Sequence, residues 1–366
     1  MYKTYSFADL VLKTKKLRGI KTDAYKILGK FPVIDQGNKF IAGYTDSNES
    51  LYEDALPVVI FGDHTLSVKY IDFPFCAGAD GTQILKPNPD IVTAKFLYYA
   101  IQNLHIKSLG YSRHFKILKE ATFKVPSLDD QNRIVEILDK ADSLRKKRRE
   151  SIELMDEYIK LVFIEMFGDP VSNPNNLEQK SLGELTKISS GSTPNRNHNE
   201  YYGGDISWVK TTEVNGSTIM ETQEKITDLG LRNSSCHLYP AGSIIVAMYG
   251  QGKTRGQVGV LGIEATTNQA CGVMPPSPSY NTEFMYRQLS YKYDDLRSLG
   301  RGGNQPNLNV GILKNYRVLY PAIEEQEKFS AIVKGSEAVK RKMLAQASDI
   351  ENQFQSLMQG AFYGTL

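Results

Sequence analysis

Two stretches of this chain are best suited to binding a polyanion, because they are rich in glycine and also carry Arg, Lys, Gln and Asn. They are Tyr249-Gly-Gln-Gly-Lys-Thr-Arg-Gly-Gln257 and Arg301-Gly-Gly-Asn-Gln-Pro-Asn307. Glycine allows a backbone to approach a groove closely, planar guanidinium and amide groups match base edges, and Lys or Arg bind phosphates. Side chains of these types could bind bases and phosphates, and ordinary surface loops are the alternative. The candidate residues are Tyr249, Gln251, Lys253, Arg255, Arg301, Asn304 and Gln305.

The first stretch also overlaps a nucleotide-binding motif. Ala247 to Thr254 matches a relaxed P-loop with Ala in place of the first Gly. A P-loop works because its amides and the N-terminus of the next helix point at phosphates, so a helix must follow. The residues from Arg255 to Ile263 are instead rich in glycine and β-branched side chains, which predicts a strand. A P-loop enzyme is therefore an alternative that this context disfavours.

The first half of the chain has stretches in equivalent positions. Gly62-Asp-His-Thr65 corresponds to the first glycine-rich stretch, and Tyr111-Ser-Arg-His-Phe115 corresponds to the second. Relative to the copy at 301, the stretch at 111–115 lacks the glycines and is five residues shorter. We therefore expect that the two halves do not bind the same sequence. Histidine can contact bases or phosphates, and Lys or Arg can anchor phosphates. The candidates here are His64, Lys69, Arg113, His114 and Lys116.

An internal repeat indicates which elements position these residues. Pro126-Ser-Leu-Asp-Asp-Gln131 recurs 195 residues later as Pro321-Ala-Ile-Glu-Glu-Gln326, and Ile117-Leu-Lys119 recurs in register as Ile312-Leu-Lys314. Each copy opens a long charged stretch with apolar residues at steps of three and four, which is typical of an amphipathic helix. The chain therefore consists of two tandem units, and each unit is a globular domain followed by a long helix.

The repeat leads to a fold class and a set of boundaries. We expect an α+β protein with two mixed α/β domains in a pseudo-two-fold tandem repeat, separated by two long antiparallel, coiled-coil-like helices. The predicted domains are 1–125 and 169–320, which includes a linker, and the predicted helices are 126–168 and 321–366. Each helix has one apolar stripe that it cannot bury alone, so mutual packing is favoured. The alternative is that each helix lies only on its own domain.

Shorter patterns predict elements inside the two domains. Apolar β-branched runs at Phe31–Asn38, Leu56–Asp63 and Ser243–Met248 predict strands that end in turns. Helical spacing of apolar residues predicts helices at Thr93–Leu104 and Glu283–Tyr293.

Bulk composition excludes several classes of protein. The chain has 44 Lys and Arg against 41 Asp and Glu, so any basic surface must come from local clustering. The three cysteines have unrelated spacings, which argues against a disulfide framework or a zinc site. We expect a cytoplasmic protein with no membrane segment. The cluster Arg145–Arg149 is either a DNA-backbone contact, a docking site for an acidic partner, or a solvated charged helix face.

The repeated helix openings, together with Phe31-Pro-Val-Ile-Asp-Gln-Gly37, Ile188-Ser-Ser-Gly-Ser-Thr-Pro194 and Gly204-Asp-Ile-Ser-Trp208, resemble the specificity subunits of Type I restriction-modification systems. The resemblance covers essentially the whole chain. It implies two target-recognition domains that each bind one half of a bipartite, asymmetric site in double-stranded DNA, with the candidate residues above as the DNA contacts. It also implies that the long helices set the spacing and dock two methyltransferase subunits.

The resemblance places all chemistry on the partners. It implies that no cofactor is bound by this chain, and that S-adenosylmethionine, Mg and ATP belong to the methyltransferase subunits and to two restriction subunits. The sequence leaves open whether a restriction subunit is present. No adenine-methyltransferase motif and no Ser/His/Asp or Cys/His constellation is found, so we expect a subunit that is non-catalytic by itself. A coiled-coil adaptor with no DNA role is a further alternative.

Overall fold

The computed structural model describes residues 2–14, 17–108, 110, 112–300 and 306–364. The chain forms two compact units, each of which combines segments that are distant in sequence. Unit 1 contains residues 1–150 and 344–366, and unit 2 contains residues 151–343. The two long helices, α4 (Leu128–Phe167) and α10 (Ile323–Tyr363), each contribute one part to unit 1 and the other part to unit 2.

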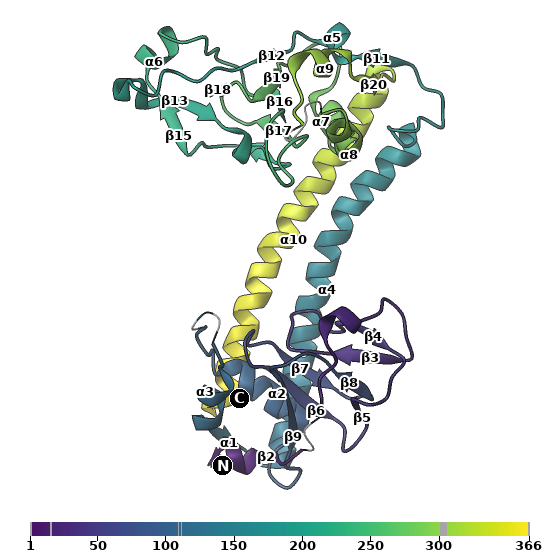
Figure 1. The fold of residues 1–366 in the computed structure, drawn as a ribbon, viewed down its shortest axis with the longest axis vertical. Coiled ribbons are helices and arrows are strands. Elements are labelled where there is room, and N and C mark those ends of the chain that lie inside the picture. The colour runs from purple at the N-terminus through teal and green to yellow at the C-terminus, as the bar shows by residue number, and fades with distance from the viewer. Residues whose placement is uncertain (1, 15–16, 109, 111, 301–305, 365–366) are drawn as a thin grey trace. The chain divides into compact units, whose positions relative to one another are not determined.

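Short strands and a few helices make up the globular part of unit 1 (Figure 1). Its elements are β1 (Lys3–Ser6), α1 (Phe7–Leu10), β2 (Val11–Leu12), η1 (Thr22–Ala24), β3 (Phe31–Ile34), β4 (Gly43–Thr45), β5 (Leu51–Tyr52), β6 (Val58–Gly62), β7 (Val68–Ile71), β8 (Phe75–Ala77), β9 (Thr82–Pro87), α2 (Ala94–Asn103), α3 (Phe115–Glu120) and β10 (Thr122–Val125).

Strand β6 organises the core of unit 1 because both of its faces are buried. In the described residues it lies inside a sheet of order β2-β9-β6-β7, and a second sheet has the order β4-β3-β8-β5. Val59 and Phe61 face the cluster that contains α2 and the ends of α4 and α10, whereas Val58 and Ile60 face a second apolar cluster. The predicted strand and the predicted helix at α2 are both confirmed, and Thr93 caps α2.

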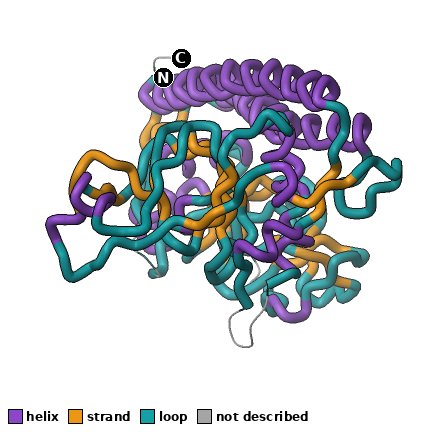
Figure 2. Tube along the Cα trace, turned by 90° about the horizontal axis from the view of Figure 1, so that it is seen from above, coloured by secondary structure: helices purple, strands orange, loops and turns teal. Residues whose placement is uncertain are grey.

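The globular part of unit 2 has the same kind of composition, with short strands between loops (Figure 1), and Figure 2 shows this mixture of short strands, helices and loops for the chain as a whole. Its elements are β11 (Gln179–Ser181), α5 (Leu182–Leu185), β12 (Ser189–Ser190), η2 (Asn199–Tyr201), β13 (Tyr202–Val209), η3 (Thr211–Glu213), β14 (Thr218–Ile219), β15 (Glu224–Ile226), α6 (Asp228–Arg232), β16 (Ile244–Ala247), β17 (Val258–Leu261), β18 (Thr266–Thr267), β19 (Cys271–Met274), α7 (Thr282–Tyr291), α8 (Tyr293–Ser298), α9 (Val310–Asn315) and β20 (Arg317–Leu319).

Strand β16 has the central position in unit 2 that β6 has in unit 1. Its sheet has the order β12-β19-β16-β17-β14 in the described residues. Ile244 and Val246 face one apolar cluster, and Ile245 and Ala247 face another. The alternation follows from the two-residue period of a strand, and a strand buried on both faces is apolar throughout.

Local signals mark both ends of α4. Ser127 accepts a hydrogen bond from the Asp130 amide at 3.2 Å and donates to its carboxylate at 2.8 Å, so it caps the start of the helix. Helix α4 stops at Gly168, whose φ of +79° favours glycine at a helix end. Among the described residues, no helix is long and apolar enough to pass through a membrane.

Within each unit, α4 and α10 pack side by side and run antiparallel (Figure 1). In unit 1, Arg145 contacts Glu351 at 3.0 Å, and Ile134 and Leu138 of α4 share a core with Phe354 and residues further along α10. In unit 2, Asp156 and Phe163 of α4 meet Lys340 and Phe329 of α10. The structure thus confirms the predicted antiparallel pair. Each helix also packs on globular elements, for example Phe163 on Phe284 of α7.

The glutamine of the repeated motif joins each long helix to a helix of a globular part. The Gln131 side chain accepts from the Thr93 amide at 2.8 Å and donates to the carbonyls of Ile91 and Pro126. The Gln326 side chain accepts from the Asn281 amide at 2.9 Å and donates to the Pro321 carbonyl. Thr93 and Asn281 are the N-caps of α2 and α7. The repeat therefore preserves a buried glutamine that hydrogen-bonds the N-cap residue of a globular helix, and we call this contact the glutamine clamp.

We predict that Gln131→Ala destabilises the junction between α2 and α4 by about 2–4 kcal/mol, because it removes the side-chain partner of three backbone groups that are buried or part-buried. Hydrogen exchange of the amides from Thr93 to Phe96 measures this effect directly. The exposed neighbour Asn132→Ala serves as the control, with an expected change within about 0.5 kcal/mol. Equal exchange rates in the two variants would contradict the clamp.

Candidate nucleic-acid interface

Four loops of unit 2 meet at one edge of its strands. Strands β13 and β18 are parallel, so their carboxyl ends lie at the same edge. The Asn268 amide donates to the Val209 carbonyl at 2.9 Å, and the Leu308 amide donates to the Met248 carbonyl at 3.0 Å. The Met248 amide also donates to the Ala270 carbonyl at 2.9 Å, and the three bonds together join the segments 210–213, 248–257, 268–270 and 306–309, which we call the loop edge of unit 2.

Unit 1 builds the same arrangement from a different sequence. Strands β3 and β8 are parallel, the Gly78 amide donates to the Ile34 carbonyl at 2.8 Å, and the His114 amide donates to the Asp63 carbonyl at 2.8 Å. The Asp63 amide donates to the Gly81 carbonyl at 2.8 Å, so the joined segments are 35–40, 63–66, 78–82 and 112–116, which we call the loop edge of unit 1. In both units the described parts of the predicted DNA-contacting stretches are thus brought together, although they are distant in sequence.

The glycine-rich loop of unit 2 is exposed at its tip and anchored at its end. Gln251 and Lys253 are exposed, and Tyr249 is 42% exposed. Arg255 donates through Nη1 to the Pro306 carbonyl, and its own carbonyl accepts from Arg297 at 2.9 Å. Arg255 is therefore placed to hold the loop against the segment before α9. The predicted residues Arg301, Asn304 and Gln305 lie outside the described residues.

The same loop does not continue as a P-loop would. Gly250 and Gly252 have φ values of +146° and +57°, which suit a tight glycine turn. The chain then enters strand β17, as its β-branched residues predicted. A phosphate-binding P-loop requires a helix N-terminus at this point, so the geometry does not favour nucleotide binding.

Three of the predicted residues of unit 1 lie at its loop edge with accessible side chains. Arg113 and Lys116 are exposed. His64 is half-buried, and its ring Nδ1 lies 3.1 Å from the Ser112 carbonyl. All three remain candidates for DNA contact.

The other two predicted residues of unit 1 are buried. Lys69 is 4% exposed, and its ammonium donates to the carbonyls of Asp35 and Lys39 at 2.8 and 2.5 Å. Burial lowers its pKa, and the nearby Asp35 carboxylate opposes that shift. His114 is fully buried, with Nδ1 2.9 Å from the Asp63 carbonyl. Both side chains hold loops in place and do not reach the surface, which corrects their assignment as DNA contacts.

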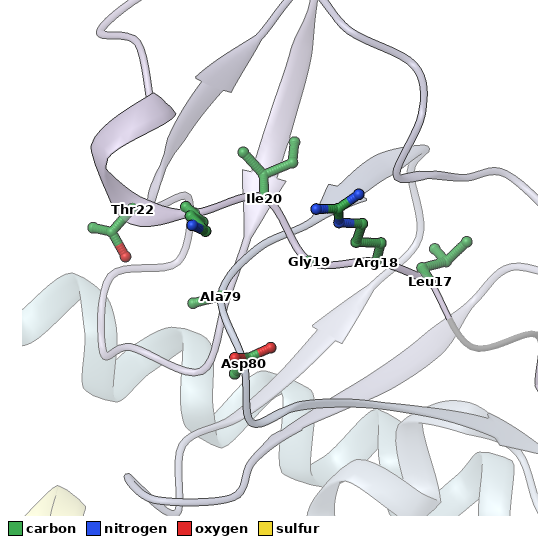
Figure 3. A pocket seen from close by; sticks show the side chains of 8 residues that line it. Leu17, Arg18, Gly19, Ile20, Thr22, Ala79 and Asp80 are labelled. Atoms are coloured by element: carbon green, nitrogen blue, oxygen red, sulfur yellow. The ribbon is translucent and has the colours of Figure 1, made fainter.

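The sequence reasoning missed further residues at the loop edge of unit 1. The Gln36 side chain donates to the Asp80 carbonyl at 2.8 Å and accepts from the His64 amide at 3.0 Å. Arg18 and Asp80 line a hollow of about 640 Å³ and come from two neighbouring segments (Figure 3). The polar turn after the apolar run of β3 was the available signal, but it did not show which loops Gln36 joins.

The basic cluster on α4 is largely neutralised inside unit 1. Arg145 pairs with Asp142 at 2.7 Å and with Glu351 at 3.0 Å, and Arg149 pairs with Glu351 at 3.0 Å. Burial raises the pKa of Asp142, but Lys146 and Arg145 outweigh it and the net pKa is lowered. The observed pairs favour a paired helix face over a DNA contact.

Asp169, which follows α4, has a structural role. The Asp169 carboxylate accepts from the amides of Val171 and Ser172 at 3.0 and 2.8 Å, so it caps a turn. Hydrogen bonds from the Ser172 backbone are the largest cause of its lowered pKa. In the part of the chain that the structure describes, no group of three or more His, Cys, Asp or Glu side chains is placed to hold a metal ion.

Comparison with known protein families gives a match in both halves of the chain. The family model described as Type I restriction modification DNA specificity domain matches residues 2–154 and 174–345. The chain belongs to this family. The first matched segment contains the loop edge of unit 1, and the second contains the loop edge of unit 2. The specificity-domain match therefore covers both candidate interfaces.

Relatives and solved structures agree with the family. The chain is 24% identical over 332 residues to the Type I restriction enzyme EcoR124I/EcoR124II specificity subunit of Escherichia coli. The matched region covers 86% of this chain and 81% of that protein. It is 26% identical over 168 residues to the MjaIX specificity subunit of Methanocaldococcus jannaschii, covering 44% of this chain and 38% of that protein.

Two solved structures share the fold. A Type I restriction-modification S subunit from M. genitalium is 15% identical and has a TM-score of 0.59, with 99% of this chain and 96% of that chain covered. A chain from a study of assembly and conformational transition of the type I R-M system is 14% identical and has a TM-score of 0.61, with 100% and 98% covered. The fold is that of specificity subunits, with two mixed domains and two long helices.

Proposed function

We propose that this chain is the DNA-recognition subunit of a Type I restriction-modification complex, and that each loop edge binds one half of a bipartite, asymmetric site in double-stranded DNA. One observation carries the proposal: both units build the same four-segment edge, and each edge lies inside a match to a DNA specificity domain. The side chains at the two edges differ, which favours two different half-sites. Nothing supports the two alternatives, a P-loop enzyme and an adaptor without a DNA role.

Mapping of methylated adenines with and without this gene tests the proposal. We expect methylation at a bipartite motif that disappears when the gene is removed. We also expect the reconstituted complex to bind this motif with a strong salt dependence, because phosphate contacts release counterions. Binding that does not respond to salt, or an unchanged methylation pattern, would contradict the proposal.

The proposed chemistry belongs to partner subunits. The family of specificity subunits is non-catalytic, and we place adenine methylation with S-adenosylmethionine on two methyltransferase subunits. Mg and ATP belong to DNA cleavage by two restriction subunits where these are present. We place the complex in the cytoplasm. In the same proposal, residues 1–125 and 169–320 are the two recognition domains, and 126–168 and 321–366 are the helical segments between them.

The exposed apolar face of the helix pair in unit 2 is a suitable docking surface for a methyltransferase subunit. Leu154 and Tyr158 of α4 are 60% and 48% exposed, and Val339 of α10 is 48% exposed. Contiguous exposed apolar side chains on a folded protein mark interaction sites. Co-purification of the methyltransferase subunit with Val339→Asp tests this assignment, and undiminished recovery would contradict it.

We also propose that the length of α4 and α10 sets the spacing between the two half-sites. The unit boundary falls at Glu150 in α4 and at Met343 in α10. Insertion of seven helical residues at both points adds about 10 Å of helix, which corresponds to roughly three base pairs. The expected methylated motif has unchanged half-sites and a longer spacer. A complex that methylates the original spacer at full rate would contradict this role.

A further inference from the structure

The loop between β3 and β4 is held by a buried charge. The strands pair antiparallel, with Val33 opposite Gly43, so residues 35–42 form the connecting loop. Lys69 of β7 inserts its ammonium beneath this loop and donates to the carbonyls of Asp35 and Lys39. An ammonium in a buried position is costly unless it is fully hydrogen-bonded. A sheet residue that binds two carbonyls of one loop fixes the shape of that loop.

Other contacts restrict the same loop. The Gly37 amide donates to the Asp35 carboxylate at 2.8 Å, and the Ala42 amide donates to the Val33 carbonyl at 2.9 Å. The Phe40 ring packs edge-on against Phe73 with centroids 6.1 Å apart. The loop therefore has a defined conformation even though its tip is exposed.

The loop belongs to the loop edge of unit 1. Gln36, at its start, bridges the Asp80 carbonyl and the His64 amide, and its own carbonyl accepts from the Thr65 hydroxyl. The exposed residues of the tip are Asn38, Lys39 and Phe40, which is 52% exposed. The start of the loop thus contacts His64, and its exposed tip carries an amide, a cation and an aromatic ring.

We propose that the segment Gln36–Phe40 is a DNA-reading element of unit 1, with Asn38 contacting a base edge, Lys39 contacting a phosphate, and Lys69 acting as the positioning residue beneath them. This inference rests on the proposed function and names residues within it. An Asn amide pairs with the major-groove edge of adenine, and a Lys ammonium supplies a sequence-independent phosphate contact. The side chains of Asn38 and Lys39 are therefore suited to binding double-stranded DNA.

In unit 2, the segment that corresponds to Gln36–Phe40 follows β13 and is held by different contacts. The DNA-reading role of Gln36–Phe40 is therefore specific to the first half-site. After β13, the Glu213 carboxylate accepts from the amides of Lys210 and Gln223, both at 2.8 Å. The Lys210 ammonium pairs with Glu224 at 2.9 Å. A carboxylate organises this segment where an ammonium organises the loop of unit 1, so variants at Lys69 should affect one half-site alone.

The direct test uses exposed residues in the complete complex with its methyltransferase subunits. Asn38→Ala should reduce discrimination at one base pair of the first half-site about tenfold, measured as methylation rates on oligonucleotides with single base-pair changes. Lys39→Ala should lower the slope of log binding constant against log salt by about 0.9 without changing discrimination. The controls Asn48→Ala and Lys124→Ala, also exposed in unit 1, should change neither quantity.

The positioning role needs a pair of variants. Lys69→Met keeps the length of the side chain but removes both hydrogen bonds, so discrimination in the first half-site should fall while the second half-site is unaffected. Lys69→Arg restores donors and should recover most of the discrimination. A purely structural lysine would instead lower the melting temperature and reduce methylation of all sites together, which would overturn the positioning role.

The outcomes separate this inference from the proposed function. If Asn38→Ala and Lys39→Ala behave as wild type while Arg255→Ala relaxes the second half-site, the DNA-reading role of the loop is wrong and the proposed function stands. If no variant at either loop edge changes DNA binding or methylation, the proposed function is wrong as well.

Discussion

Phe163→Ala is expected to lower the free energy of unfolding of unit 2 by about 3–5 kcal/mol. Phe163 is fully buried between α4, α7 and α10. Its ring centroid lies 5.1 Å from Phe167, 5.5 Å from Phe284 and 5.3 Å from both Tyr291 and Phe329. Truncation removes four aromatic contacts at once and leaves a cavity that packed helices cannot close.

Hydrogen exchange in peptides of α4, α7 and α10 measures this loss within unit 2 alone. Leu161→Ala is a matched control, because Leu161 lies two residues away on α4 and is 56% exposed. We expect the control to change stability by no more than about 0.5 kcal/mol. Comparable exchange in the two variants would show that the aromatic cluster does not hold the helices together.

Arg255→Ala is expected to reduce base discrimination in the second half-site by about 10- to 100-fold while the first half-site keeps its specificity. The guanidinium ties the glycine-rich loop to Pro306, and the Arg255 carbonyl accepts from Arg297. Without the guanidinium, the glycines of the loop leave its tip free to adopt many conformations. A mismatch in a DNA site normally costs about 1–3 kcal/mol, and this discrimination needs the reading groups to be held in place.

Methylation rates of the complete complex on oligonucleotides with single changes in either half measure this prediction. Arg232→Ala is the control, since Arg232 is an exposed arginine of unit 2 on α6 and outside the loop edge. Relaxed discrimination in both half-sites, or in neither, would contradict the placement of Arg255. A uniform fall in affinity with specificity intact would instead identify Arg255 as a phosphate contact.

Local patterns in the sequence were sufficient for the long helices and the central strands. The apolar stripe and the repeated helix opening placed the first long helix at 126–168, within a few residues of the observed bounds of α4. The helix predicted at Thr93–Leu104 spans Ala94–Asn103. These features depend on residues close together in the chain, so their periodicity and capping can be recognised without knowledge of the fold. The same holds for the tandem repeat and the family resemblance.

The accessibility of polar side chains depended instead on contacts between distant residues. Lys69 and His114 appear as surface candidates in the sequence, yet each is buried against carbonyls 30 to 51 residues away. The role of Gln131 in clamping α2, 38 residues earlier, was equally invisible. A charged or polar residue type does not reveal whether its partner is water, a phosphate or a backbone carbonyl, because only the assembled strands and loops bring that partner within hydrogen-bonding distance.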